Sequence, residues 1–220
     1  GGNILNHLGK YIRKLNIGTD AYVITNAFIK TKYGKLLNDI LKKSGFTARF
    51  KTVPDTEKSK SMEGATLIIK DITHYDKKRR LFIVAFGGGV IGDLAGFTAS
   101  IYKRGVPYIQ VPTTLLAQVD SSIGGKTAVD LNLGKNLVGA FYQPRLVFSE
   151  VGILRTLDTR QIRSGLAEVI KYGIIKDARF FDYLEKSYQD ILDLKISALE
   201  FIVMRSSSIK AKIVQQDERE

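Results

Sequence analysis

The sequence predicts an α/β fold, with a parallel sheet over residues 1–150 and the first part of an all-helical domain over residues 151–220. Short apolar runs alternate with helix-period segments in the first part, which is the pattern of βαβ units. The run at 81–86 is apolar throughout, as strands buried on both faces of a parallel sheet are. Beyond residue 150, strand patterns and glycines become scarce, so the fold class is expected to change there.

Each expected element follows from its hydrophobic period and its boundary residues. The first part should contain strands at 21–25, 47–53, 81–86 and 107–111. Helices should connect them over about 27–44, before Gly45, then over about 55–72 and about 91–102, although Gly64 interrupts the second pattern. Three further helices are expected in the second part, over about 158–175, 178–190 and 193–215.

Composition excludes several classes of protein. Hydrophobic residues make up 44% and charged residues 25% of the 220, which is typical of a globular chain with a packed core. No apolar run reaches the roughly 18 residues that a membrane span needs, and the first residues lack the pattern of a signal peptide. Because there is no cysteine, disulfides and thiolate metal sites are excluded. We therefore expect a cytoplasmic protein with no membrane partner.

The net charge of +12 has two interpretations. Clustered lysines and arginines bind nucleic acids, whereas dispersed ones form a solvated surface that keeps some cations for small anionic ligands. The positive residues are dispersed, and the densest cluster, 77–80, directly precedes an expected strand, where a solvated turn is natural. The second interpretation is favoured, and no nucleic-acid partner is expected.

A glycine loop at 87–93 follows an expected buried strand and opens a helix, and Gly87, Gly89 and Gly92 satisfy G-x-G-x-x-G. Glycines allow a pyrophosphate to approach the backbone at a helix N-terminus, where unpaired N–H groups point outward. The alternative is a tight turn that needs glycine only for packing. The loop follows the third expected strand, and 109–111 lack the ribose-binding acid expected about 20 residues on, so this is no ordinary Rossmann site.

Residues 120–127 combine an acid, two hydroxyls and a lysine around paired glycines, and Lys135–Asn136 follow soon after. We expect this polar segment between apolar runs to be a loop that lines a ligand site, with an ordinary surface loop as the alternative. Gly125, Lys126 and Thr127 end like a P-loop, but Asp120 occupies the place of its first glycine. An acid there would repel a nucleotide triphosphate, which disfavours an ATPase.

Glu168 and Lys171 lie three residues apart in the otherwise apolar segment 166–175. Little of that helix should face solvent, so two buried charges would need partners or a role. One hypothesis makes Glu168 a metal ligand beside a substrate-binding Lys171, and the other makes them a structural ion pair. The two histidines, His7 and His74, have no metal-ligand spacing and are expected to be surface or turn residues.

Four segments, 86–97, 102–105, 110–127 and 165–173, resemble 3-dehydroquinate synthase. The resemblance spans nearly the whole chain and is strongest from Phe86 to Tyr172. It implies a Rossmann-like NAD-binding domain and a helical domain for metal and substrate. It also implies an enzyme of the shikimate pathway that converts 3-deoxy-arabino-heptulosonate 7-phosphate to 3-dehydroquinate and phosphate, with NAD used catalytically and a divalent metal, usually zinc and possibly cobalt.

The resemblance also implies roles for individual residues. Those expected at the NAD site are Asp55, Glu57, Lys60, Gly88, Gly89, Val90, Gly92, Asp93, Thr113, Thr114, Leu116, Ser121, Lys126, Lys135 and Thr156. Those expected to hold the sugar acid phosphate are Asp120, Lys126, Asn136, Lys171 and Lys210. Arg104 resembles the arginine that reaches the phosphate of a neighbouring subunit's ligand, which implies a homodimer. Glu168 would be the one metal ligand present.

Asn26 and Gln161 depart from the family pattern, since many relatives carry acids at both positions. The family's two metal-binding histidines lie downstream of a segment like 217–220, so the chain is expected to be C-terminally truncated. Three alternatives remain: another NAD-dependent sugar phosphate cyclase, a metal-dependent polyol dehydrogenase of the same architecture, and a non-catalytic NAD-binding module.

Overall fold

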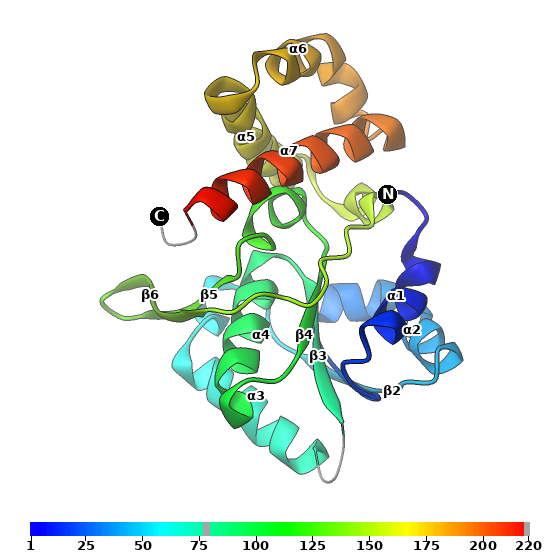
Figure 1. Ribbon diagram of the computed structural model, residues 1–220, viewed down its shortest axis with the longest axis vertical. Coiled ribbons are helices and arrows are strands. Elements are labelled where there is room, and N and C mark those ends of the chain that lie inside the picture. Colours follow the sequence, from blue (N-terminus) through cyan, green and yellow to red (C-terminus); the bar gives the residue numbers. More distant parts are fainter. Residues whose placement is uncertain (77–79, 218–220) are drawn as a thin grey trace.

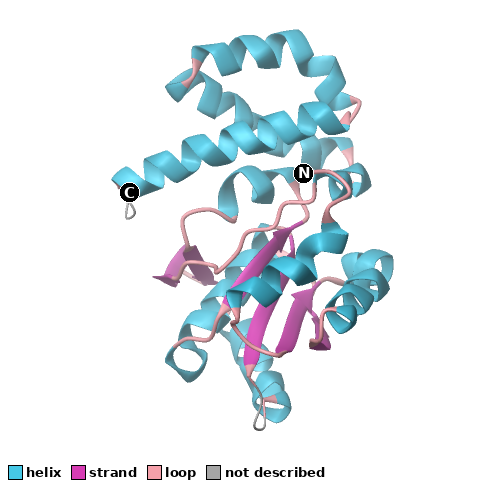
Figure 2. Cartoon of the chain, turned by 45° about the vertical axis from the view of Figure 1, so that its right-hand side comes forward, coloured by secondary structure: helices cyan, strands magenta, loops and turns pink. Residues whose placement is uncertain are grey.

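The computed structural model describes residues 1–76 and 80–217. Its centre is a four-stranded parallel sheet in the order β2-β1-β3-β4. Figure 2 shows the strands in magenta, with helices around them. The strands are β1 (Asp20–Thr25), β2 (Thr47–Thr52), β3 (Leu81–Gly87) and β4 (Tyr108–Pro112). All four predicted strands and the α/β class are confirmed. The basic turn predicted at 77–80 falls, apart from Arg80, outside the described residues, as does the end of the charged segment 217–220.

Helices cover both faces of the sheet, which is why β1 and β3 are buried along their whole length. One face packs against α1 (Leu8–Leu15) and α2 (Ala27–Lys43), and the other packs against α3 (Met62–Tyr75) and α4 (Gly89–Ile101) (Figure 1). Successive residues of β1 alternate between the two cores: Val23 faces α1 and α2, whereas Ile24 faces α3 and α4. Burial of each such side chain stabilises the fold by about 1.5–3 kcal/mol relative to its exposure to water.

The helix predicted from residue 55 begins later, at Met62, so that prediction was wrong at its start. The Ser61 hydroxyl accepts a hydrogen bond from the Gly64 N–H at 3.1 Å and caps the helix. A short 3-10 turn, η2 (Glu57–Ser59), precedes the cap. A Cβ at Gly64 would lie 2.3 Å from the Ser59 carbonyl oxygen. This glycine therefore permits the close approach of the turn and does not interrupt the helix.

The helix predicted to end at Tyr102 ends one residue earlier and is followed by a left-handed turn. This turn, η3 (Tyr102–Arg104), has φ of 49° at Lys103 and 64° at Arg104, values that non-glycine residues rarely adopt. The buried Asp76 carboxylate holds it, since it accepts a hydrogen bond from Tyr102 at 2.9 Å and pairs with Lys103 at 2.5 Å.

The polar segment predicted as a loop, 120–127 with Lys135 and Asn136, is a loop only over 122–125, so the loop prediction was wrong for the rest of the segment. A short π-helix, η4 (Ala117–Ser121), comes first, and the strands β5 (Lys126–Leu131) and β6 (Gly134–Phe141) follow as an antiparallel hairpin. The hairpin projects from the side of the sheet domain (Figure 1). Gly139 is needed there, because a Cβ would lie 2.3 Å from the Thr127 carbonyl oxygen of the paired strand.

The three helices predicted after residue 150 are present, preceded by a 3-10 segment, η5 (Val151–Thr156). They are α5 (Thr159–Lys176), α6 (Ala178–Leu192) and α7 (Ile196–Gln216). They form a layer above the sheet domain, and α7 packs on the π-helix η4 (Figure 1). Leu115 and Val119, which precede residue 150, share the core of this layer. Among the described residues, none of the helices is long and apolar enough to cross a membrane.

The prediction that α5 offers little surface to solvent was wrong. Ile170 is 40% exposed and Ile174 is 69% exposed. Lys171 is exposed as well, with 54% of its side chain accessible. The buried face of α5 is therefore limited to residues such as Val169 and Tyr172, which pack into the helical layer.

An ion pair on the sheet domain predicts how stability changes with acid. Arg49 donates to Asp71 at 2.9 Å and 3.2 Å, and these hydrogen bonds lower the pKa of Asp71 to about 2. A lowered carboxyl pKa stabilises the fold above the unfolded pKa, near 3.9, and this contribution is lost as the pH falls toward 2. In Asp71→Asn and in Arg49→Met, the melting temperature should therefore fall less between about pH 4 and pH 2 than it does in the wild type. At neutral pH each variant should lose about 1 kcal/mol or less of unfolding free energy, because the pair is part-exposed. The same decrease in melting temperature with acid in both variants as in the wild type would contradict this assignment.

Candidate functional site

The segments with candidate functional residues meet at the carboxyl edge of the parallel sheet. Asn26 follows β1, Gly88 follows β3 and Thr113 follows β4. From β1 the chain continues to β2 on one side of the sheet, and from β3 it continues to β4 on the other side. The helices that make these connections, α2 and α4, cover opposite faces, so β1 and β3 flank a topological switch point. The crevice at such a switch point is where open α/β sheets bind ligands. The strand–loop–helix context that the glycine motif requires is therefore present.

The glycines of this loop divide into two groups. At Gly87 an added Cβ would lie 2.6 Å from Ile91, and at Gly92 it would lie 2.8 Å from Gln110, so both serve packing. At Gly88 and Gly89 the nearest atoms, of Thr114 and Ser121, are 3.1 and 3.2 Å away. Gly88 is also the N-cap of α4, where unpaired N–H groups and the positive helix dipole attract anions. Gly88 and Gly89 thus form a backbone cradle that can accept a phosphate, with Val90 in the first turn of α4.

A groove of about 700 Å³ lies at the carboxyl ends of β1 and β2. Asn26, Asp55, Thr156 and Gln161 line it, together with Pro54 and Asp158. The Asn26 amide donates to the Asp55 carboxylate at 2.7 Å. Burial raises the pKa of Asp55, and the hydrogen bond from Asn26 opposes that shift. The groove brings together two residues predicted for the NAD site and the two positions that depart from the family pattern.

The other residues predicted for the adenosine side lie elsewhere. Lys60 is 5% exposed and its ammonium lies 2.6 Å from the Asp93 carboxylate; it also donates to Asn136. Burial raises the pKa of Asp93, and the hydrogen bond and charge of Lys60 offset only part of that rise. Glu57 lies on the surface, where it pairs with Lys135 at 3.3 Å. Lys60 and Glu57 are therefore tied to the hairpin and do not line the groove that contains Asp55.

A second hollow, a cavity of about 510 Å³, lies between the π-helix, the hairpin and α7. Its polar lining comes from residues far apart in the sequence: Asp93, Asp120, Ser121, Lys126, Asn136 and Lys210. Four of the five residues predicted to hold the substrate are among them. Ser121 also faces Gly89, so the cavity adjoins the cradle. Two lysines in a partly enclosed hollow suit a small anionic ligand.

Asp120 is the centre of the polar network at this cavity. The Asp120 Oδ1 atom pairs with Lys210 and accepts a hydrogen bond from the Tyr172 hydroxyl at 2.9 Å. Burial raises the pKa of Tyr172, and the negative charges of Asp120 and Glu168 raise it further. Tyr172 therefore remains a neutral hydrogen-bond donor at physiological pH.

Lys171 does not line the cavity, contrary to the expectation that all five substrate residues converge. It pairs with Glu168 one helical turn away, and its ammonium lies 5.4 Å from the centre of the Tyr172 ring. The next residue of α5, Tyr172, connects this part of the helix to the cavity through its hydrogen bond to Asp120. Glu168 is mostly buried, with 17% of its side chain exposed.

The remaining predicted NAD-site residues lie around the end of β4. Thr113 is buried and donates its backbone N–H to the Gly87 carbonyl at 2.9 Å. Thr114 faces Gly88, and its hydroxyl accepts from the Ala117 N–H at 3.1 Å. Leu116 is 37% exposed. These three residues hold the loop that forms one wall of the cradle.

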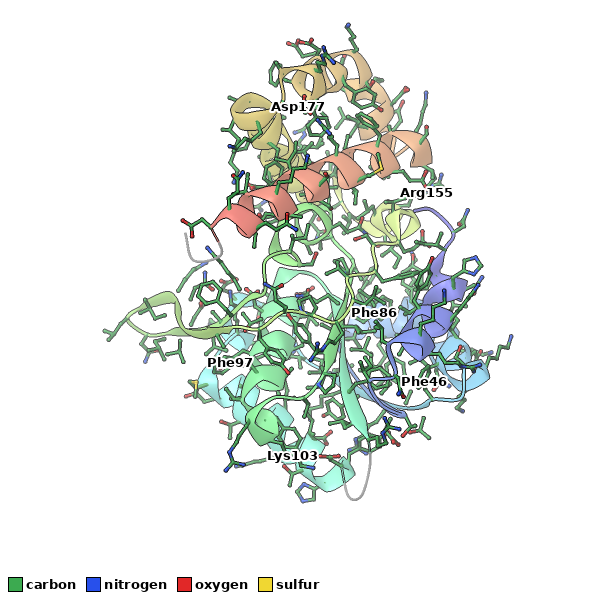
Figure 3. All side chains as sticks on the ribbon, in the orientation of Figure 1. Phe46, Phe86, Phe97, Lys103, Arg155 and Asp177 are labelled. Carbon is green, nitrogen blue, oxygen red and sulfur yellow. The ribbon has the colours of Figure 1, made fainter. Side chains whose placement is uncertain are left out.

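Arg104 does not line the cavity of its own chain. It follows the C-terminal end of α4, and 13 helical residues span about 20 Å from the cradle. Figure 3 shows its neighbour Lys103 at the end of the molecule opposite to Asp177 of the helical layer. Arg104 is exposed and is held in the left-handed turn described above. It lines neither the cavity nor the groove described above.

Tyr172 is the site residue that the sequence analysis missed. The available signal was its spacing: Glu168 and Tyr172 are four residues apart in a helix and so share a face. His7 and His74 are exposed, as predicted. No group of three or more histidine, aspartate or glutamate side chains able to hold a metal occurs in the described part of the chain.

The protein-family model of the 3-dehydroquinate synthase N-terminal domain matches residues 50–164 of this sequence. The family model of the C-terminal domain matches residues 165–220. The 3-dehydroquinate synthase of Thermoanaerobacter pseudethanolicus is 46% identical over 97% of this chain and 60% of its own length. That of Caulobacter vibrioides is 49% identical over 90% of this chain and 54% of its own length. The chain therefore spans about 60% of the length of the first of these relatives.

Solved structures of related enzymes share the fold. The 2-epi-5-epi-valiolone synthase of Streptomyces hygroscopicus, with NAD⁺ and Zn²⁺ bound, superposes with a TM-score of 0.90 at 27% identity, over 100% of this chain and 61% of its own. A 2-deoxy-scyllo-inosose synthase, in complex with carbaglucose-6-phosphate, NAD⁺ and Co²⁺, superposes with a TM-score of 0.86 at 28% identity. The match covers 97% of this chain and 58% of that chain. The glycerol dehydrogenase of Schizosaccharomyces pombe, at 19% identity, shares the fold alone.

Proposed function

This chain belongs to the 3-dehydroquinate synthase family, and from that premise we propose that it forms the NAD-binding and substrate-anchoring part of such an enzyme. The whole enzyme would convert 3-deoxy-arabino-heptulosonate 7-phosphate to 3-dehydroquinate and phosphate. Residues 1–150 would bind the cofactor, and residues 151–220 would begin the domain for metal and substrate. The observation that carries the proposal is the cradle of Gly88 and Gly89 beside a cavity with two lysines.

The residues present fit the cofactor and part of a metal site. Any side chain at Gly88 would fill the space that a pyrophosphate needs, and the groove with Asn26 and Asp55 would take the adenosine end. Glu168 supplies one carboxylate for a divalent cation, and the other ligands would come from residues beyond those of this chain. When bound, NAD would accept and return a hydride, and the metal would act as a Lewis acid on substrate hydroxyls.

The residues of the cavity match the charges of the proposed substrate. The heptulosonate carries a carboxylate and a phosphate, so it needs cations and polar donors at separate points. Lys126 and Lys210 would bind the anionic groups, and Asn136 would donate to or accept from a hydroxyl. Asp120 would orient Lys210 and accept from a substrate hydroxyl. Lys171 would join them only after movement of α5 or of its own side chain.

We further propose a homodimer in which Arg104 reaches the phosphate bound by the partner. The support is its position: it is exposed, held in a left-handed turn after α4, and absent from the lining of its own cavity. Burial of the Asp76–Tyr102 hydrogen bond keeps this turn rigid, as an arginine that must act across an interface requires.

The proposal is tested by the reaction of the full-length protein with the heptulosonate, NAD and Zn²⁺. We expect stoichiometric release of phosphate with no net NADH, because the cofactor is reduced and reoxidised in each cycle. Net NADH formation with glycerol would instead identify a polyol dehydrogenase. Phosphate release from another sugar phosphate but not from the heptulosonate would identify a different cyclase. NAD binding without turnover of any of these compounds would leave a binding module.

A further inference from the structure

The Tyr172 hydroxyl lies at the junction of the two parts of the site. It donates to the Asp120 Oδ1 atom at 2.9 Å, and the residue lies one helical turn after Glu168 on α5. The residue is 2% exposed and its ring packs in the core of the helical layer. A phenylalanine would fill the same core, so the hydroxyl itself needs an explanation beyond packing.

Asp120 has two partners on one oxygen, and they differ in mobility. Lys210 is a point charge on a flexible four-carbon chain, so it can turn toward an anionic ligand in the cavity that both residues line. The phenol of Tyr172 is fixed by the packing of its ring and has only two side-chain torsions. When Lys210 turns to a ligand, Tyr172 is the partner that stays.

We propose that Tyr172 is a positioning residue, which holds the Asp120 carboxylate in place while Lys210 engages the substrate. The inference rests on the proposed function, in which Asp120 and Lys210 bind the sugar acid phosphate. Tyr172 does not touch the ligand and acts through Asp120.

The test is Tyr172→Phe in the full-length protein, which removes one oxygen atom and leaves the ring. We expect kcat to fall about tenfold, as for other residues that orient a functional group, with KM for NAD within about twofold of wild type. The matched control is Tyr183→Phe, since Tyr183 lies in the same helical layer. The centre of its ring lies 4.2 Å from the centre of the Phe201 ring. This control should retain wild-type kcat.

A double-mutant cycle separates positioning from structural support. In the Asp120→Asn background, Tyr172→Phe should lower kcat/KM by less than about twofold, because the group that it positions has already changed. An equal loss in both backgrounds, or no loss in the wild-type background, would overturn the proposal. An inactive wild-type protein would instead refute the proposed function, so the two failures are distinguishable.

Discussion

Gly88→Val is expected to weaken NAD binding about 100-fold, or about 2.7 kcal/mol, while the chain remains folded. The backbone of Gly88 has φ of −76°, which a valine adopts without strain. Its Cβ would lie 3.1 Å from the Thr114 methyl group, a tight contact that a small shift of this side chain relieves. The methyl groups of the valine would then stand over the backbone that the pyrophosphate must approach. The loss arises because a phosphate cannot reach N–H groups that are covered by two methyl groups.

Calorimetric titration of NAD into the wild-type and variant chains measures this loss directly. Ala178→Val is a suitable control, because it adds the same two methyl groups at an exposed position of α6. The control should bind NAD as tightly as the wild type. Equal NAD affinity in Gly88→Val, with an unchanged melting temperature, would show that the cofactor does not use this cradle.

Glu168→Gln in the full-length protein is expected to lower turnover roughly a thousandfold, which corresponds to about 4 kcal/mol of transition-state stabilisation. The substitution keeps the size of the side chain but removes the charge that attracts a divalent cation. The fold should persist, because the released Lys171 is 54% exposed and stays solvated. Loss of bound metal and loss of turnover should therefore occur together.

The zinc content of the dialysed protein and the rate of phosphate release are the two measurements. Glu185→Gln, at an exposed position of α6, is the matched control and should keep both values. If Glu168→Gln retained full zinc content and normal turnover, Glu168 would be only the partner of Lys171 in a structural ion pair.

The parallel sheet could be predicted from the sequence because three of its strands, β1, β3 and β4, are buried along their whole length. A run such as 81–86 is apolar throughout and has no other plausible environment in a globular chain of this size. The hairpin β5–β6 was missed for the opposite reason. Most of β6 is exposed or half-buried, and its strands carry polar residues for the cavity, so the alternation that marks a strand is weak.

Errors within helices came from tertiary contacts that no local pattern contains. The start of α3 depends on the cap at Ser61 and on the close approach of η2 to Gly64. The exposed apolar side chains of α5, Ile170 and Ile174, made the segment seem buried on all sides, although the helix packs on one face only. Apolar composition predicts a helix, but it does not predict which face is covered.

The site could be predicted in part. The cradle is local, so a strand, glycines and a helix start at consecutive positions were enough to locate it. The cavity is not local: Asp120 and Lys210 are 90 residues apart, and only the family resemblance suggested that they meet. Tyr172 was missed because a tyrosine in an apolar helix usually belongs to the core, and its hydroxyl acquires a role only from its neighbours in space.

A crystal structure of the protein with NAD tests the central claim most directly. We expect the pyrophosphate against the backbone of Gly88 and Gly89, the adenosine in the groove of Asn26 and Asp55, and the nicotinamide directed toward the cavity of Lys126 and Lys210. NAD bound at another surface, or a cradle that stays empty at saturating NAD, would contradict the account.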